Sequence, residues 1–296
     1  MRLLKVKRWI ALLMLFLVPL TSLAEDPYSL PIALVPGCEP NPACFSANAY
    51  HDDSLDVRME QQEYNGVTVN LAWIEVKSPT QLRTAIAGTT GDMYAEGRPG
   101  PIVHANNAVV AINGDFFTRR NGLIYRQGVA IKQSESENKD ALFIDENGDF
   151  HIFVDSKPAD MVAYLQAGHR MINTFSFGPG LIIDGEVQKI RSDYWFEPEG
   201  RSQRTALCQT GPLQYLFVEV VGRTLRSRGF TMQQLADYLG TLGCVRQAYN
   251  LDGGDSTIMY FGKMYYDNRF HGEGEKRAIS DIVYVATAVD PSTWKK

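Results

Sequence analysis

Residues 67–76 have the sequence Val-Thr-Val-Asn-Leu-Ala-Trp-Ile-Glu-Val, in which apolar and polar side chains alternate along the length of a strand. Successive side chains of a β-strand point to opposite faces, so this pattern predicts a strand with one face toward a core. The run Ala108–Ile112 is wholly apolar, as expected of a buried central strand. Further strands are predicted over residues 141–145, 150–154, 181–184, 215–221, 245–251, 257–261 and 282–287.

Two helices are predicted among these strands. Met232–Leu242 follows Thr231, a natural N-cap residue, and Gln234 completes a capping box. The apolar residues of this segment fall on one helical face, so the helix should lie against a sheet, and Gly243 should end it. The segment Pro158–Ala167 opens with proline, which suits a first helical turn.

These elements predict an α+β fold, a single sheet-dominated domain with a few packed helices over residues 61–290. Residues 25–60 are rich in Pro, Asn and Asp and are interpreted as a lead-in tied down by a disulfide. Residues 1–24 combine a basic start, an apolar run and a small-residue end, as in a secretory signal peptide. An uncleaved anchor is the alternative. We therefore predict a periplasmic or secreted protein without a stable membrane span after cleavage.

The composition limits the classes of function. The chain has 296 residues, 45% of them hydrophobic and 21% charged, and a net charge of -5. These values are ordinary for a globular protein and exclude a disordered tail or a multi-span membrane protein. Removing the four basic residues of the leader leaves a charge of -9. Proteins that follow nucleic-acid phosphates concentrate positive charge, so nucleic acid is not expected as a partner.

The four cysteines, Cys38, Cys44, Cys208 and Cys244, all follow the leader. An even count in an exported chain predicts two disulfides, which four cysteines can form in three pairings. Joining Cys38 to Cys44 and Cys208 to Cys244 is the most economical, since each bond closes a loop within one region. A tetrathiolate zinc site is the competing interpretation, but the chain has no C-x-x-C spacing.

Two apolar strands run directly into turns rich in glycine and oxygen-bearing side chains, over residues 111–117 and 249–257. Each turn alone is typical of an ordinary hairpin. Two such turns favour a shared site, because rigid strands hold ligand-binding loops in place. The candidate residues in these turns are Asn113, Gly114, Asp115, Asn250, Asp252, Gly253, Gly254, Asp255 and Ser256.

Two arginines are further candidates. Arg204 enters an apolar stretch, and Arg277 lies next to the last predicted strand, after a polar loop that contains His271. A guanidinium offers a planar fork to a phosphate or a carboxylate, although a surface arginine at a strand start is as common. The chain lacks the G-x-S-x-G, H-E-x-x-H and Walker motifs. Serine-hydrolase and zinc-peptidase functions therefore have little support.

The chain resembles the phosphodiester glycosidase family over about residues 65–288, and the motifs that carry the resemblance are specific in combination rather than singly. They are Asn113–Phe117, Phe177–Pro179, Arg204–Ala206, Gly229–Ala236 and Asn250–Ser256. The resemblance implies hydrolysis of the C1–O bond of a sugar-1-phosphodiester, and with the predicted signal peptide we expect an exported enzyme that acts on envelope or extracellular glycans. Free sugar and a phosphomonoester would be the products. Asp255 stands where members commonly have a third glycine.

The chemistry of such a cleavage suggests the roles. Arg204, with Arg277, would hold the phosphate, and Asp252 would act as base or nucleophile. Asp115 would be an acid partner. The residues expected to bind substrate oxygens or approach the substrate through their backbone are Asn113, Gly114, Asn250, Gly253, Gly254, Asp255, Ser256 and Arg277.

No cofactor is required by this scheme. Any metal on Asp115, Asp252 and Asp255 would be Ca²⁺ or Mg²⁺, because these ligands are all oxygens. Two rival functions remain: a metal-dependent phosphodiesterase that cuts the P–O bond, and a glycan-binding module without catalysis. The expected partner in each case is a sugar-phosphate or a glycan.

Overall fold

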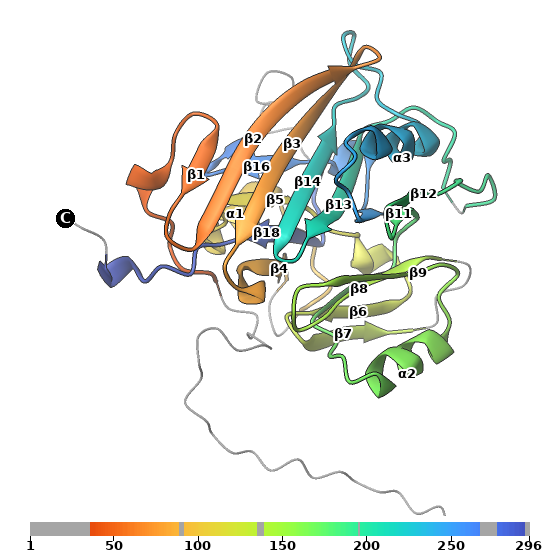
Figure 1. Ribbon diagram of the computed structural model, residues 1–296, viewed down its shortest axis with the longest axis horizontal. Helices are drawn as coiled ribbons and strands as arrows, with labels where there is room; N and C mark the ends of the chain where they lie inside the picture. Colours follow the sequence, from red (N-terminus) through yellow and green to blue (C-terminus); the bar gives the residue numbers. More distant parts are fainter. Residues whose placement is uncertain (1–35, 89–91, 135–138, 195, 267–276, 294–296) are drawn as a thin grey trace, which may run out of the picture.

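The computed structural model describes residues 36–88, 92–134, 139–194, 196–266 and 277–293 (Figure 1). The predicted signal peptide and the loop with His271 lie outside these residues. The structure is dominated by β-strands, which confirms the predicted α+β class. Short 3-10 helices also occur, at η1 (Pro42–Cys44), η2 (Pro79–Gln81), η3 (Phe117–Arg119), η4 (Gly254–Ser256) and η5 (Pro291–Thr293).

The largest sheet has eight strands, all antiparallel to their neighbours, and several of them lie side by side in Figure 1. The strands follow the order β1 (Ala49–His51), β2 (Leu55–Tyr64), β3 (Val67–Val76), β14 (Gln214–Val220), β13 (Arg204–Gly211), β15 (Gln247–Asn250), β11 (Gly180–Ile183) and β12 (Glu186–Val187). The segment Val67–Val76 is therefore a strand with the predicted bounds.

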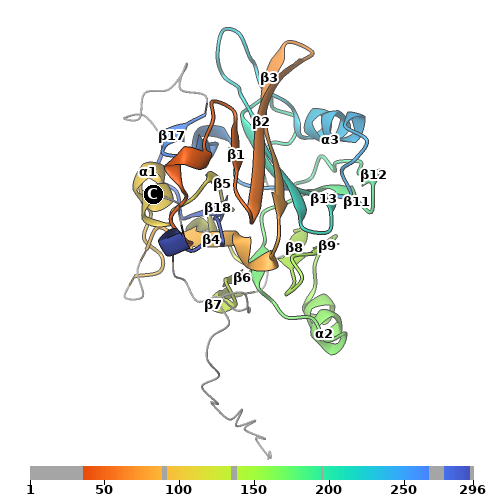
Figure 2. The same cartoon turned by 60° about the vertical axis from the view of Figure 1, so that its left-hand side comes forward.

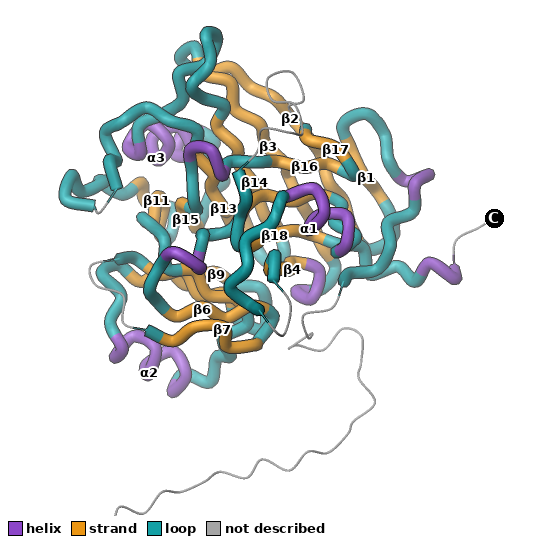
Figure 3. Tube along the Cα trace, turned by 180° about the vertical axis from the view of Figure 1, so that it is seen from behind, coloured by secondary structure: helices purple, strands orange, loops and turns teal. Residues whose placement is uncertain are grey.

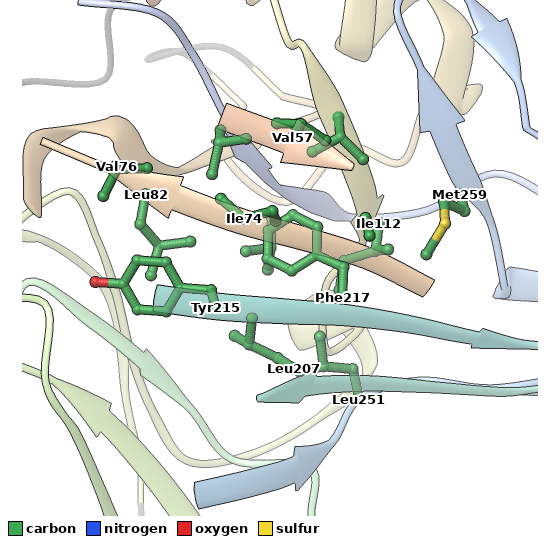
Figure 4. Close-up of a cluster of buried hydrophobic side chains, with 14 of the residues drawn as sticks. Val57, Ile74, Val76, Leu82, Ile112, Leu207, Tyr215, Phe217, Leu251 and Met259 are labelled. Atoms are coloured by element: carbon green, nitrogen blue, oxygen red, sulfur yellow. The ribbon is translucent and has the colours of Figure 1, made fainter. Parts of the chain in front are cut away.

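A second sheet of five antiparallel strands packs against the first. Its order is β17 (Met264–Tyr265), β16 (Met259–Phe261), β5 (Val110–Asn113), β18 (Asp281–Val285) and β4 (Leu82–Ile86). The main hydrophobic core fills the space between the two sheets, where Phe217 and Ile74 of the large sheet meet Ile112 and Met259 of the small one (Figure 4). Strand β5, which begins two residues later than the apolar run Ala108–Ile112 and ends at the polar Asn113, is buried on both faces as predicted.

Helices cover the outer faces of these two sheets. Helix α3 (Met232–Thr241) packs on the large sheet, where Leu235 and Leu239 meet Val218, and its capping box is formed by Thr231 and Gln234. Helix α1 (Pro99–Ala105) covers the outer face of the five-stranded sheet, with Val103 against Tyr284. Figure 2 shows the two helices on opposite sides of the molecule, and Figure 3 shows α1 beside β18.

A smaller layer lies at one end of this sandwich (Figure 1). It contains β10 (Asn173–Phe175), β8 (Ala141–Ile144) and β9 (Phe150–Phe153) in one sheet and β6 (Leu123–Arg126) with β7 (Val129–Gln133) in another. Helix α2 (Pro158–Gln166) packs its Tyr164 against Phe143 of this layer. No helix within the described ranges is long and apolar enough to span a membrane.

The predicted disulfides are not present in the structure, in which all four cysteines are free thiols. Cys208 is fully buried under α3, whereas Cys244 is exposed after that helix. Cys44 ends η1 and packs against the main core, whereas Cys38 forms a strand bridge with Thr287. Cys208 and Cys244 nevertheless lie close enough for Cys244 to contribute, after burial, to raising the pKa of the Cys208 thiol.

Candidate functional site

The two polar turns meet where the two large sheets adjoin. The first follows β5 of the five-stranded sheet, and the second follows β15 of the eight-stranded sheet. The backbone N–H of Asp252 donates to the carbonyl of Gly114 over 3.2 Å. The side chain of Asn113 also donates to the carbonyl of Asp252 over 2.8 Å. The predicted proximity of the two turns is therefore confirmed.

The side-chain amide of Asn113 joins the two turns and uses all of its hydrogen-bonding capacity. Its Nδ2 donates to the carbonyls of Gly114 and Asp252, and its Oδ1 accepts from the Thr205 hydroxyl over 2.8 Å and from the N–H of Ile258 over 3.2 Å. A primary amide can donate two bonds and accept two, so this side chain is saturated within the protein. The geometry therefore indicates that Asn113 connects the two turns and does not contact substrate directly.

Asp115 belongs to a buried ionic network. Its Oδ1 lies 2.7 Å from Nη2 of Arg126, which is also 2.7 Å from Oδ2 of Asp281, and its Oδ2 accepts from the N–H of Ser176 over 3.1 Å. The side chains of the two aspartates and the arginine are at most 2% exposed. Burial and the charge of Asp115 raise the pKa of Asp281, and Arg126 opposes that rise. The geometry therefore assigns Asp115 to positioning rather than to proton transfer.

Gly114 is required by the same network. A Cβ atom at this position would lie 2.2 Å from Oδ2 of Asp281. Such a separation is far below van der Waals contact, so any side chain at residue 114 would displace that carboxylate. The turn therefore brings its backbone close to Asp281 rather than to an open surface.

Asp252 is the carboxylate best placed to react. It is 9% exposed, and its Oδ1 accepts from the N–H of Gly253 over 2.9 Å. Its Oδ2 has no hydrogen-bond partner within the described part of the chain. Burial raises the pKa of Asp252, while the nearby Ser256 hydroxyl and the charges of Arg277 and Arg120 act to lower it. The Ser256 hydroxyl lies near the carboxylate, although neither Oγ of Ser256 nor Oδ2 of Asp252 makes a hydrogen bond of regular geometry in the described part of the chain.

Two other buried atoms near Asp252 also have no hydrogen-bond partner among the residues that the structure describes. They are Oδ1 of Asn250 and Oγ of Ser256, both in side chains that are 1% exposed. A buried polar atom without a partner costs about 1–3 kcal/mol. The Ser256 hydroxyl already interacts with the Asp252 carboxylate, so Oδ1 of Asn250 is the atom that most clearly indicates a place where a polar ligand would complete the hydrogen bonding.

Two arginines place positive charge beside Asp252. The guanidinium of Arg277 lies 4.4 Å from the ring centre of Phe116, and that of Arg120 lies 5.6 Å from the ring centre of Phe177. Burial and the charge of Arg277 lower the pKa of Arg120, whereas Asp252 raises it. The half-buried Lys139 adds a third cation, since Arg120 contributes to lowering its pKa. The charges of Arg277 and Arg120 therefore act on Asp252, whereas Lys139 interacts with Arg120, and the charge of Asp115 acts on both Arg120 and Lys139.

Arg120 and Lys139 are not among the site residues predicted from the sequence. Arg120 lies five residues after Asp115, beyond the 3-10 helix η3 that turns the chain back. The adjacent basic pair Arg119 and Arg120 was the available signal. Only Arg120 reaches the site, because Arg119 is exposed and forms an ion pair with Glu96 at 2.9 Å.

Arg204 lies beside the second turn, but its guanidinium is already engaged. It donates from Nε to the carbonyl of Phe230 over 3.1 Å and from Nη2 to that of Gly200 over 2.6 Å. Its Cδ would lie 3.8 Å from a Cβ built at Gly253. Burial and the charge of Arg223 lower the pKa of Arg204 to about 10. The geometry therefore indicates that Arg204 stabilises the second turn and does not bind phosphate.

The remaining predicted residues line the edge of the second turn. Asp255 is exposed and forms an ion pair with Arg223 at 2.9 Å. Gly254 has a φ of +60°, a conformation that favours glycine. Because Asp115 and Asp255 are both bonded to arginine, two of the three predicted ligands for Ca²⁺ or Mg²⁺ are paired with guanidinium groups.

A cavity of about 570 Å³ lies away from these turns. It is formed between the lead-in, with Pro42 and Phe45, and the end of α1, with Val103 and His104. None of the candidate catalytic or substrate-binding residues lines it. Its walls lack the carboxylate and guanidinium pair found at the turns, so the chemistry points to the turns rather than to this cavity.

Comparisons with known proteins agree with this architecture. A family model for phosphodiester glycosidases matches residues 106–286. The uncharacterized SPbeta prophage-derived protein YomE of Bacillus subtilis (strain 168) is 25% identical over 185 residues, which are 60% of this chain and 28% of that protein. This chain therefore spans little more than a quarter of the length of that relative.

Two solved structures share the fold. The first is the zebrafish N-acetylglucosamine-1-phosphodiester alpha-N-acetylglucosaminidase catalytic domain, auto-inhibited by its pro-peptide. It matches with a TM-score of 0.62 and 19% identity over 82% of this chain and 87% of that one. The second, a hypothetical protein from Synechocystis, has a TM-score of 0.53 and 15% identity over 79% and 62% of the two chains.

Proposed function

Because this chain belongs to the phosphodiester glycosidase family, we propose that it hydrolyses the glycosidic C1–O bond of a sugar-1-phosphodiester. The products are the free sugar and a phosphomonoester. We further propose that the protein is exported and acts on envelope or extracellular glycans, since residues 1–24 have the pattern of a signal peptide.

One observation carries this proposal: a buried carboxylate with one unpartnered oxygen lies among cationic side chains. Cleavage of a sugar–phosphate bond passes through an oxocarbenium-like state at C1, which a carboxylate stabilises. Asp252 fits this role, with Oδ2 available and Oδ1 held by the N–H of Gly253. Water then adds to C1 as the C1–O bond breaks, and Asp252 accepts the proton that the water loses.

Arg120 and Arg277 would hold the departing phosphate. A phosphate leaving group is a weak base, so neutralising its charge matters more than protonating it. Both guanidinium groups rest on aromatic rings, which limits their freedom before substrate arrives. Ser256 and Asn250 would contact substrate oxygens through their unpartnered atoms, while Asn113, Asp115 and Arg204 keep the turns in place.

The bond that breaks can be identified with isotopically labelled water. We expect the full-chain protein, incubated with a UDP-sugar in ¹⁸O-water, to place the label on C1 of the released sugar. Mass spectrometry of both products measures its position. Label in the phosphate instead would mean P–O cleavage and would contradict the proposal. Saturable binding without any product would identify a glycan-binding module.

The dependence of activity on pH tests the role of Arg120. Asp252 must be ionised to act, and its pKa is raised by burial, so activity should fall as pH decreases through a value above the ordinary aspartate pKa of about 3.9. Arg120 lowers that pKa. In R120M the acid limb of kcat/KM should therefore move to higher pH.

R119M is the matched control for R120M. It removes the neighbouring guanidinium, which is exposed and paired with Glu96. Its acid limb should coincide with that of the wild-type protein. If the acid limb of R120M were unchanged, or if R119M and R120M shifted it equally, Arg120 would have no specific effect on the pKa of Asp252.

A further inference from the structure

A cluster of three potential metal ligands lies in the small layer, apart from the two polar turns. Oδ2 of Asp145 is 3.0 Å from Nε2 of His151 and 3.3 Å from Nδ1 of His169. These three atoms all lie within 4.8 Å of one another. Asp145 follows β8, His151 belongs to β9, and His169 lies in the loop after α2, the region coloured green in Figure 1.

The carboxylate of Asp145 is fixed before any ligand binds. Its side chain is 1% exposed, and its Oδ1 accepts from the N–H groups of Asn147 over 2.8 Å and of Asp149 over 3.0 Å. These two bonds leave Oδ2 facing both imidazoles. Hydrogen bonds to the second oxygen of a liganding carboxylate orient it and tune its affinity for metal.

Tyr164 holds the two imidazole rings in place. Its ring stacks on His169 with centres 4.9 Å apart, and it meets His151 edge-on with centres 5.2 Å apart. The hydroxyl of Tyr164 donates to the carbonyl of Arg170 over 3.0 Å, which fixes its position. Both histidine side chains remain 31% exposed, so an ion can reach their nitrogen atoms from solvent.

Two of the separations in the cluster match those of a tetrahedral site, and all three atoms lie within 4.8 Å of one another. Ligand atoms about 2.0–2.1 Å from a tetrahedral metal lie about 3.3 Å from one another. The two distances from Oδ2 of Asp145 are close to this value. Oε1 of Glu146 lies 4.0 Å from Nδ1 of His169 and offers a fourth oxygen. A simple Asp–His ion pair involves a single histidine. Here Oδ2 of Asp145 lies close to two histidines, which come from different segments of the chain.

We propose that Asp145, His151 and His169 bind a divalent transition metal ion of the Zn²⁺ class, with Glu146 or water as fourth ligand. Two imidazoles and a carboxylate suit this class of ion, whereas Ca²⁺ and Mg²⁺ prefer oxygen ligands alone. The ion ties the β8–β9 hairpin to the loop after α2 and so stabilises the small layer. This role is independent of the glycosidase function proposed above.

Co²⁺ is the probe, because tetrahedral Co²⁺ has intense visible absorption bands and octahedral Co²⁺ has weak ones. The full-chain protein is stripped with chelator and titrated with Co²⁺. We expect tetrahedral bands that saturate at one equivalent and vanish on adding Zn²⁺. H151Q and H169Q should each weaken binding by at least the roughly 10- to 100-fold that loss of an outer-shell partner costs. H104Q should not, because His104 is exposed and bonds to the carbonyl of Lys263.

Two further measurements do not depend on activity. Zn²⁺ should raise the Tm of the wild-type protein and of H104Q, but not of H151Q or H169Q. X-ray absorption of the Zn²⁺-loaded wild-type protein should show scattering from two imidazoles, a result that needs no variant. Octahedral Co²⁺ spectra, absence of imidazole scattering, or equal Co²⁺ affinity in wild type and H169Q would each overturn the proposal.

Discussion

D252N is expected to lower kcat/KM for a sugar-1-phosphodiester by about 100- to 10,000-fold, the range in which positioned acid–base groups contribute. The amide keeps the size of the side chain but can neither carry the negative charge nor accept the proton from water. Oδ2 of Asp252 is buried and has no hydrogen-bond partner in the described ranges, so it is available to a substrate or to a water molecule. Steady-state kinetics on purified variants measure the loss.

The fold of D252N should survive. Burial raises the pKa of Asp252, which means that the folded state disfavours its charge, so a neutral side chain should not reduce the free energy of unfolding substantially. D237N is the matched control, since Asp237 is exposed on α3 and bonds to Gln233. Near-normal turnover in D252N, or an equal loss of activity in D237N, would show that Asp252 has no specific role in the reaction.

R126M is expected to lower the free energy of unfolding by about 3–5 kcal/mol, since it leaves the buried carboxylates of Asp115 and Asp281 without their shared cation. Urea unfolding measures the change. R223M breaks the exposed ion pair with Asp255 and should cost less than about 1 kcal/mol. A similar small cost for both variants would show that the buried network does not hold the first turn.

The loss in R126M should depend on pH. Arg126 opposes the rise in the pKa of Asp281 that burial and Asp115 cause, so its removal raises that pKa further. A carboxyl group whose pKa is raised in the folded state stabilises it while protonated, and this contribution is lost as pH rises through the folded-state pKa. The deficit of R126M should therefore be smaller at mildly acidic pH than at alkaline pH. An equal deficit at both would contradict this assignment.

The elements predicted best are those whose signals are local. Strand β3 has the predicted bounds, but both of its faces are buried rather than one, because the main core covers one face and helix α3 the other. Helix α3 has the predicted capping box and apolar face. By contrast, α1 was missed because its seven residues, Pro99–Ala105, include two prolines and a glycine and show little periodicity. The strands β4 and β6 were also missed, since buried polar residues such as Arg83 and Arg126 interrupt their apolar pattern.

The site was predictable in its location but only partly in its roles. Two glycine-rich turns at strand ends indicated one site, and the hydrogen bond from Asp252 to Gly114 joins them. The direction in which each side chain points was not predictable. Arg204 donates to backbone carbonyls, and Asp115 pairs with Arg126 rather than facing Asp252.

The order of amino acids by itself determined the sheet-dominated class, the family and the two turns, because strand alternation, helix caps and turn residues act between near neighbours. Tertiary structure alone decided which charges meet. Arg126 and Asp281 are 155 residues apart, and His151 reaches Asp145 only through a hairpin while His169 arrives from beyond α2. Contacts between distant segments depend on how sheets pack, and local patterns carry no information about that packing.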